Sequence, residues 1–238
     1  MPTALVIGAA MGGLAAAIGL RNAGYRVTVH ERAPELRPLG AGLSLWSNAV
    51  QALRILGAAE RIEAEAEPID TMLGATHDGR PVLGSRGVTA GDGTPAYLVT
   101  RALLQSALLD ALGEAEVRLG SDLVNIDQNG VGTTAEFGGG GTERADLIII
   151  ANGIWSLQGI ALIGNPPRHC GYGGVLALSD PVAHLQSARK VAEHWGNRER
   201  FGLCDIGGGR HYWFHIVDQP PGAAPLYFAR CLSRASDG

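Results

Sequence analysis

The amino-acid sequence predicts an α/β fold, in which a domain built on a parallel sheet and a β-meander is joined to a second, strand-rich domain. Residues 3–31 read as strand, helix and strand, the unit that parallel sheets repeat. Short strands over residues 116–152 end in the buried run "DLIII". After residue 158 the pattern changes to alternating strands such as "RHYWFHIV", with Pro-rich breaks. We therefore expect two domains, one made of residues 1–70 and 98–158 and the other of residues 71–97 and 159–238.

Composition and charge narrow the class of protein. The chain has 238 residues, of which 46% are hydrophobic and 18% charged, as is typical of a globular protein. The formal net charge is −4 and the 19 basic residues are scattered, so the sequence lacks the basic run that nucleic acid or an anionic membrane would attract. We expect a small molecule as partner, no nucleic acid and no membrane. The sequence is compatible with a homo-oligomer.

The cysteines and histidines show no spacing typical of disulfides or metal sites. Cys170, Cys204 and Cys231 are odd in number and far apart. His211 and His215 share one face of a predicted strand, but no third ligand accompanies them. The N-terminus lacks the basic residues of a signal peptide, and no apolar run is long enough to span a bilayer. We therefore expect a cytoplasmic protein without a metal.

The first strand, helix and strand have the features of a dinucleotide-binding unit. An apolar strand over residues 4–7 precedes a small-residue helix over residues 11–23, and the next strand, "RVTVHE", ends in Glu31. In the pattern G-x-G-x-x-G, Ala10 takes the second glycine position, where the backbone approaches the pyrophosphate. The glycines that remain let the turn form, so the helix N-terminus still attracts phosphate while Glu31 can bond a ribose hydroxyl. These glycines are Gly8, Gly12 and Gly13.

The segments that follow complete the first domain. Apolar residues recur at helical spacing over residues 48–57, and residues 100–113 form an amphipathic helix with Thr100 as its N-cap. The strands "EVRLG", "LVNIDQ" and "VGTTAEF" predict a three-stranded meander that leads into the buried strand of "RADLIIIANG". The pair Asn129-Gly130 predicts a tight hairpin turn between two of these strands.

Four segments in this order resemble the FAD-dependent aromatic hydroxylases, the class A flavin monooxygenases, and especially their urate and salicylate hydroxylase-like members. The segments are the first strand-helix-strand unit with Glu31, "LRPLGAGLSLWSNAVQALRILG", "TRALLQSALL" and "DLIIIANGIWS", and "NRERFGLCDIGGGRHYWF" adds to them. The resemblance implies a Rossmann-like FAD-binding domain with a β-meander and a strand-rich substrate domain. It also implies that NAD(P)H reduces FAD and that a flavin C4a-hydroperoxide hydroxylates an aromatic or heteroaromatic small molecule.

The resemblance also assigns roles to single residues. It implies that Glu31 binds the adenosine ribose, that Arg101 lies along the flavin nucleotide and that the backbone of Val124 lies near the adenine. Arg200 and Tyr212 are the expected substrate-side residues. The expected cofactor-binding residues are Gly8, Ala10, Gly12, Gly13, Glu31, Arg32, Arg101, Val124 and Asn152.

Several departures from the family pattern predict weak FAD binding. Ala10 adds a methyl group at the pyrophosphate, Asn152 replaces the aspartate of the family's "DG" element, and Gly159 stands where an arginine is usual. The family's later Gly-Asp segment is absent, because the chain ends at "CLSRASDG". An alternative is therefore a hydroxylase scaffold with weak or no FAD that acts as a cyclase, an isomerase, or a binding or regulatory partner. A plain NAD(P)-dependent dehydrogenase fits less well, because the meander is typical of flavoproteins.

Overall fold

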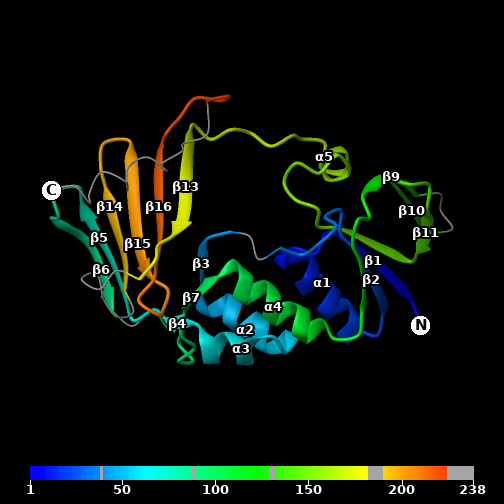
Figure 1. The fold of residues 1–238 in the computed structure, drawn as a ribbon, viewed down its shortest axis with the longest axis horizontal. Coiled ribbons are helices and arrows are strands. Elements are labelled where there is room, and N and C mark those ends of the chain that lie inside the picture. The colour runs from blue at the N-terminus through cyan, green and yellow to red at the C-terminus, as the bar shows by residue number, and fades with distance from the viewer. Residues whose placement is uncertain (38–39, 87–88, 129–131, 182–189, 224–238) are drawn as a thin grey trace. The chain divides into compact units, whose positions relative to one another are not determined.

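A computed structural model describes residues 1–37, 40–86, 89–128, 132–181 and 190–223 of the chain (Figure 1). Its contacts divide the chain into two compact units. The first unit comprises Met1–Leu39, Ala52–Ile62 and Ala102–Arg168, and the second comprises Gly40–Gln51, Glu63–Arg101 and His169–Gly238. These units are groups of contacts, so the residue ranges predicted above for the two functional domains stay a prediction.

The first unit is built on a parallel sheet with the strand order β12-β1-β2-β8. Its strands are β1 (Thr3–Ile7), β2 (Arg26–His30), β8 (Glu116–Arg118) and β12 (Leu147–Ile150). Helix α1 (Met11–Asn22) connects β1 to β2 and packs on both strands, with Leu14, Ala17 and Ile18 buried. The strand-helix-strand unit and the α/β fold class predicted from the sequence are thus confirmed.

A β-meander packs on this sheet, but its strands are not all the predicted ones. The strands β9 (Leu123–Gln128), β10 (Thr133–Phe137) and β11 (Thr142–Ala145) form an antiparallel sheet. The prediction that "EVRLG" starts the meander is wrong, because β8 pairs in parallel with β2 and β11 supplies the third meander strand. Phe137, Ala135 and Leu123 of the meander share a buried core with Leu5 and Ile7 of β1. The predicted turn at Asn129-Gly130 lies outside the described residues.

The helices agree with the sequence only in part. Helices α2 (Ser47–Leu56) and α4 (Arg101–Leu112) lie within about a residue or two of the predicted ranges, whereas α3 (Ala59–Glu65) and α5 (Leu157–Ile163) were not predicted. The Arg21 guanidinium of α1 donates hydrogen bonds to the carbonyls of Ala111, at 2.9 Å, and Leu112, which fastens α1 to the end of α4. Among the helices that the structure describes, none combines the length and the apolar character that a membrane span requires.

The second unit is strand-rich. Its larger sheet has the order β13-β16-β15-β14-β5-β6, in which only β14 and β5 run parallel. These strands are β5 (Thr71–Thr76), β6 (Pro81–Arg86), β13 (Tyr172–Leu178), β14 (Lys190–Trp195), β15 (Glu199–Asp205) and β16 (His211–Asp218). Residues 211–217 of the segment "RHYWFHIV" therefore belong to β16, which lies between two antiparallel neighbours.

A smaller antiparallel sheet completes the second unit. It has the order β3-β7-β4, with β3 (Gly42–Leu45), β4 (Glu67–Pro68) and β7 (Tyr97–Thr100). Tyr212 and Phe214 of β16 pack with Leu98 of β7 in the buried core of the unit. Gly42 is required in this core, because a Cβ atom there would lie 2.6 Å from Cγ of Tyr212.

Candidate functional site

The carboxyl ends of three parallel strands meet at the loop that follows β1. The Gly8 N–H donates a hydrogen bond to the carbonyl of His30 at 2.7 Å, and the Ala151 N–H donates to the carbonyl of Ile7 at 2.8 Å. Gly8 has φ +110°, and a Cβ atom there would lie 2.4 Å from the Ala151 carbonyl oxygen. Only glycine fits at this point, which is the edge of a parallel sheet where α/β proteins bind their ligands.

The glycines of the loop have different roles. A Cβ atom on Gly13 would lie 1.8 Å from the Gly8 carbonyl oxygen, so this glycine is needed for the close packing of α1 on the loop. A Cβ atom on Gly12 would meet nothing within 4 Å. The sequence placed all three glycines in one pattern, but the packing of the described residues requires only Gly8 and Gly13.

Ala10 is the N-cap residue of α1. Its φ of −78° and ψ of 175° are ordinary for any residue, so alanine causes no backbone strain there. Its side chain is exposed and none of the described side chains caps the helix; the first turn also contains no acidic residue. The backbone N–H groups of this first turn therefore remain open to an anion, which the helix dipole also attracts.

Glu31 holds the loop from the adjacent strand. Its carboxylate accepts hydrogen bonds from the N–H groups of Ala9, at 2.8 Å, and Ala33, at 2.9 Å. A carboxylate can accept about four hydrogen bonds, so it retains capacity for ribose hydroxyls. The side chain of Gln105 in α4 donates to the Ala9 carbonyl at 3.2 Å. Sequence analysis missed Gln105, because only the fold brings α4 to the loop.

Asn152 lies two residues after the end of β12 and against the same loop. A Cβ atom on Gly8 would be 3.0 Å from the Asn152 Cα atom. The Asn152 Oδ1 atom is buried and accepts no hydrogen bond from the residues that the structure describes. Buried oxygens of this kind are normally paired, so this acceptor fits a donor on a bound molecule. The open helix N-terminus, the Glu31 carboxylate and this unpaired oxygen together fit the adenosine-diphosphate half of a dinucleotide.

Three other expected cofactor residues are distributed over the two units. Arg32 is exposed beside Glu31. Val124 of β9 is 60% exposed, and its carbonyl already accepts a hydrogen bond from Gln158 at 3.1 Å. Arg101 belongs to the second unit, where its N–H donates to the Ala41 carbonyl at 3.0 Å.

Arg200 and Tyr212, the expected substrate-side residues, lie on one face of the larger sheet but in different surroundings. In the pairing of β15 with β16, Arg200 lies opposite Ile216 and Tyr212 lies opposite Cys204. The Arg200 guanidinium is partly exposed, 5.4 Å from the centre of the Phe214 ring and 3.6 Å from Glu193 Oε2. Tyr212 is buried in the core, and burial raises the pKa of its hydroxyl. The structure thus does not bring these two side chains together.

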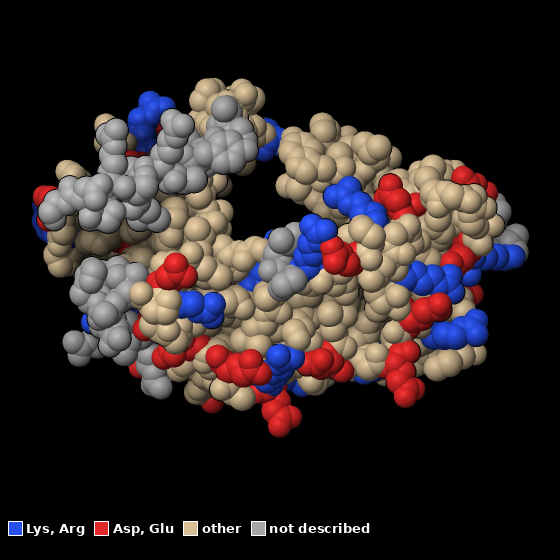
Figure 2. All heavy atoms as spheres, in the orientation of Figure 1, with Lys and Arg blue, Asp and Glu red and all other residues tan. Residues whose placement is uncertain are grey.

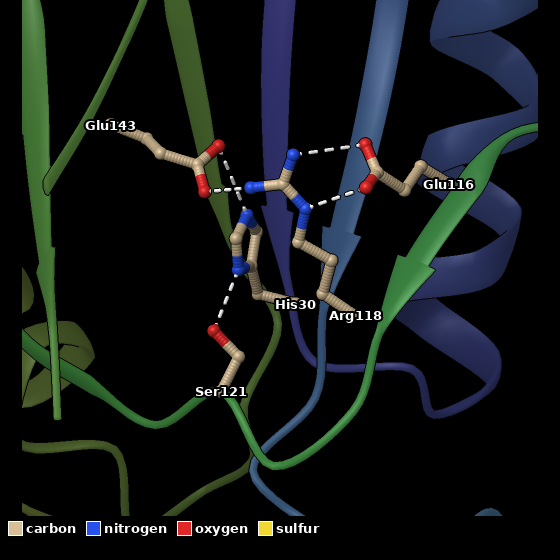
Figure 3. Close-up of polar contacts among 5 residues, drawn as sticks. All are labelled: His30, Glu116, Arg118, Ser121 and Glu143. Carbon is tan, nitrogen blue, oxygen red and sulfur yellow. Dashed lines mark hydrogen bonds and ion pairs between the residues drawn. The ribbon is translucent and has the colours of Figure 1, made fainter. Parts of the chain in front are cut away.

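The buried histidine nearest the site is one that sequence analysis did not single out. His30 ends β2, and its ring lies between Ser121 and Glu143, while Arg118 joins Glu143 to Glu116 (Figure 3). His215, by contrast, pairs with Glu199 at 3.0 Å on the larger sheet of the second unit. In the described ranges no group of His, Cys, Asp and Glu side chains is arranged to hold a metal ion. On the face drawn in Figure 2, acidic and basic side chains of the described residues are interspersed.

Comparison with known proteins agrees with this site. A family model described as "FAD binding domain" matches residues 1–219. The chain is 31% identical over 229 residues to an FAD-dependent urate hydroxylase of Mycolicibacterium vanbaalenii, covering 92% of this chain and 57% of that protein. It is also 31% identical over 230 residues to the 3-amino-4-hydroxybenzoate 2-monooxygenase of Streptomyces cremeus, again covering 92% and 57%.

A solved structure agrees at the level of the fold and the sequence. The crystal structure of Klebsiella pneumoniae HpxO, complexed with FAD and uric acid, superposes with a TM-score of 0.83 at 28% identity, over 94% of this chain and 58% of that chain. The chain thus spans a little under three-fifths of the length of these relatives. Their activities do not favour the alternative of a scaffold without redox function. The chain therefore belongs to the FAD-binding-domain family of FAD-dependent aromatic hydroxylases.

Proposed function

We propose that the protein binds FAD at the loop Gly8–Gly13 and, with NADH or NADPH as reductant, takes part in the hydroxylation of a small aromatic or heteroaromatic molecule. One observation carries the proposal: the Glu31 carboxylate is held at the Ala9 N–H, beside a helix N-terminus that none of the described side chains caps. This combination offers hydrogen bonds to a pyrophosphate and to a ribose at adjoining positions.

Different residues of the chain would bind different parts of FAD. The N–H groups at the start of α1 would hold the pyrophosphate, Glu31 the ribose hydroxyls, and Asn152 Oδ1 a donor of the cofactor. Arg32, Arg101 and Val124 are proposed from the family pattern. When bound, FAD supplies the redox chemistry and the activation of oxygen, which no amino-acid side chain provides. The protein positions the cofactor and the substrate and excludes water.

The substrate class follows from the second unit. Arg200 is partly exposed and its guanidinium lies over the Phe214 ring, so it can bind a planar, electron-rich ring that carries negative charge. Two relatives, an FAD-dependent urate hydroxylase and a 3-amino-4-hydroxybenzoate 2-monooxygenase, support this class. We propose Arg200 as the residue that binds this charge and Tyr212 as part of the wall behind it.

The departures from the family pattern bear on affinity. Because the backbone of Ala10 is unstrained, Ala10 can weaken FAD binding only through its methyl group. We propose that this methyl group and the amide of Asn152 make FAD a weakly held cofactor. We also propose residues 1–70 and 98–158 as the FAD-binding domain, residues 71–97 and 159–238 as part of the substrate domain, and the cytoplasm as the location.

The function is tested by adding FAD to the purified protein and measuring quenching of flavin fluorescence. NADH or NADPH oxidation is then followed with urate, with 3-amino-4-hydroxybenzoate and without substrate, and hydroxylated product is identified by mass spectrometry. Saturable FAD binding with substrate-stimulated oxidation supports the proposal. Absence of FAD binding overturns it, and FAD binding without any product limits the function to binding of the cofactor.

A further inference from the structure

The backbone of His30 is part of the FAD-site loop. Its carbonyl accepts the hydrogen bond from the Gly8 N–H at 2.7 Å, and the next residue, Glu31, holds the Ala9 N–H at 2.8 Å. The first two N–H groups of the loop are therefore bonded to two consecutive residues of one strand end. A shift of the His30 backbone would move the Gly8 hydrogen bond directly and the Ala9 hydrogen bond through the adjoining Glu31.

The side chain of His30 is held by residues from several elements. The ring is 1% exposed and stacks on Phe137 at the end of β10, with the ring centres 4.1 Å apart. Its Nδ1 atom lies 2.8 Å from the hydroxyl of Ser121, and its Nε2 atom lies 3.5 Å from Oε2 of Glu143 in β11. Ser121 also donates its N–H to the Glu31 carbonyl at 2.9 Å. Ser121 thus ties the ring of His30 and the backbone of Glu31 to one turn.

Glu143 is itself held in place. Arg118 of β8 bonds the Glu143 carboxylate with one nitrogen and the Glu116 carboxylate with two others, at 2.8 and 3.0 Å (Figure 3). These three charged side chains also line a cavity of about 870 Å³ in the first unit, so they are open to solvent, whereas the ring of His30 is buried. The arrangement keeps a neutral imidazole between a hydroxyl and an anchored carboxylate.

We propose that His30, braced by Ser121, Phe137 and Glu143, is a positioning residue that keeps Glu31 and the Gly8–Ala9 backbone in the geometry that binds FAD. The proposal rests on the proposed function for its link to FAD, but the ordering of the loop by His30 is independent of the cofactor. His30 of β2 stacks on Phe137 of the meander, so the meander supports the binding loop through this side chain.

The charge of His30 gives the brace a pH dependence. Burial lowers the pKa of His30 below its ordinary value of 6.5; Glu143 opposes this shift and Arg118 adds to it. Because this pKa is lowered in the folded state, the imidazole of His30 is protonated at a higher pH in the unfolded chain than in the folded one. The brace is therefore complete at neutral pH and is weakened as the pH falls below 6.5 toward the pKa of the folded state.

The test compares Ser121→Ala, His30→Phe and His30→Asn with wild type and with the control His194→Asn, which changes an exposed histidine of β14. Amide hydrogen exchange of Gly8 and Ala9 is measured by NMR without cofactor, and FAD affinity is measured by fluorescence at pH 8 and pH 5.5. Ser121→Ala should speed exchange at both amides and weaken FAD binding about fivefold to tenfold, the scale of one hydrogen bond. His30→Phe should have a larger effect on both the exchange rates and FAD affinity than Ser121→Ala. The effect of His30→Asn should be smaller than that of His30→Phe.

The outcomes separate positioning from general stability. Two results support the proposal. Amide exchange becomes faster only at Gly8 and Ala9, and the drop in FAD affinity from pH 8 to pH 5.5 is smaller in His30→Phe than in wild type. Unchanged exchange at both amides in the folded variants overturns it, as does an equal acceleration throughout the sheet. If His30→Phe does not fold, Ser121→Ala decides by the same readouts. If wild type binds no FAD, the proposed function fails while the exchange rates still decide the role of His30.

Discussion

The backbone N–H of Ala9 donates a hydrogen bond to Oε2 of Glu31 at 2.8 Å. This contact joins the loop after β1 to the end of β2, and it points the carboxylate at the N-terminus of α1. The same side chain thus orders the loop and, in the proposed site, would present an acceptor to a ribose. The assignment of the site depends on this double role, and the variants below separate its parts.

Replacing Glu31 by alanine should weaken FAD binding by about 1 to 3 kcal/mol, or roughly fivefold to 150-fold, because the ribose loses its acceptor and Ala9 loses its partner. Fluorescence titration measures the change. Glu114→Ala is the matched control, since Glu114 is an exposed glutamate in the turn between α4 and β8. Unchanged FAD affinity in Glu31→Ala would move the site to another part of the chain.

Replacing Ala10 by glycine should tighten FAD binding, by about threefold to tenfold. The expected cause is removal of the methyl group at the pyrophosphate, and glycine is also a better N-cap than alanine. Ala23→Gly, at the C-cap of the same helix, controls for the general effect of glycine on α1. If both substitutions change FAD affinity alike, the methyl group of Ala10 is not what limits binding.

Replacing Asn152 by alanine separates binding from stability. Its Oδ1 atom accepts no hydrogen bond from the described residues, so removing it should leave the melting temperature of the cofactor-free protein unchanged or slightly raised. FAD affinity should fall about fivefold to tenfold, because the cofactor loses an acceptor. A large drop in melting temperature with unchanged FAD affinity would show that Asn152 is structural.

The first unit was the more predictable part of the fold, for physical reasons. The run of buried residues in β1, the glycines at φ-positive and close-packed positions and the acid after β2 are all local features, so they appear directly in the sequence. The meander was misassigned by one strand, because the pairing of β8 with β2 joins residues far apart in the chain. The alternation of apolar and polar residues predicts that a strand exists, but it does not predict with which other strand that strand pairs.

The brace around His30 could not be found in the sequence. In "RVTVHE" the histidine reads as one more residue of a strand, and nothing nearby marks Ser121 or Glu143 as its partners. Likewise, the family pattern gave Arg200 and Tyr212 the same role. Only the packing of the folded chain shows that Arg200 is partly exposed and that Tyr212 belongs to the core. A cluster of side chains from strands far apart in the sequence can be recognised only once the fold is known.

Replacing Arg200 by glutamine should weaken binding of an anionic ring such as urate to the FAD-loaded protein, by about tenfold, while leaving FAD affinity unchanged. The change in flavin absorbance on adding urate measures this. Arg198→Gln is the matched control, because Arg198 pairs with Asp218 at 2.6 Å and is also exposed. Equal effects of both substitutions would assign the change to the net charge of the surface rather than to Arg200.

The central claim is that the loop Gly8–Gly13 is an FAD site weakened by Ala10, and a titration of the purified protein with FAD tests it most directly. We expect the protein to purify with little or no yellow colour and to bind added FAD saturably, with an affinity raised by Ala10→Gly and lowered by Glu31→Ala. A protein that purifies fully loaded with FAD would contradict the weakened site. A protein that takes up no FAD at all, with or without Ala10→Gly, would contradict the site itself.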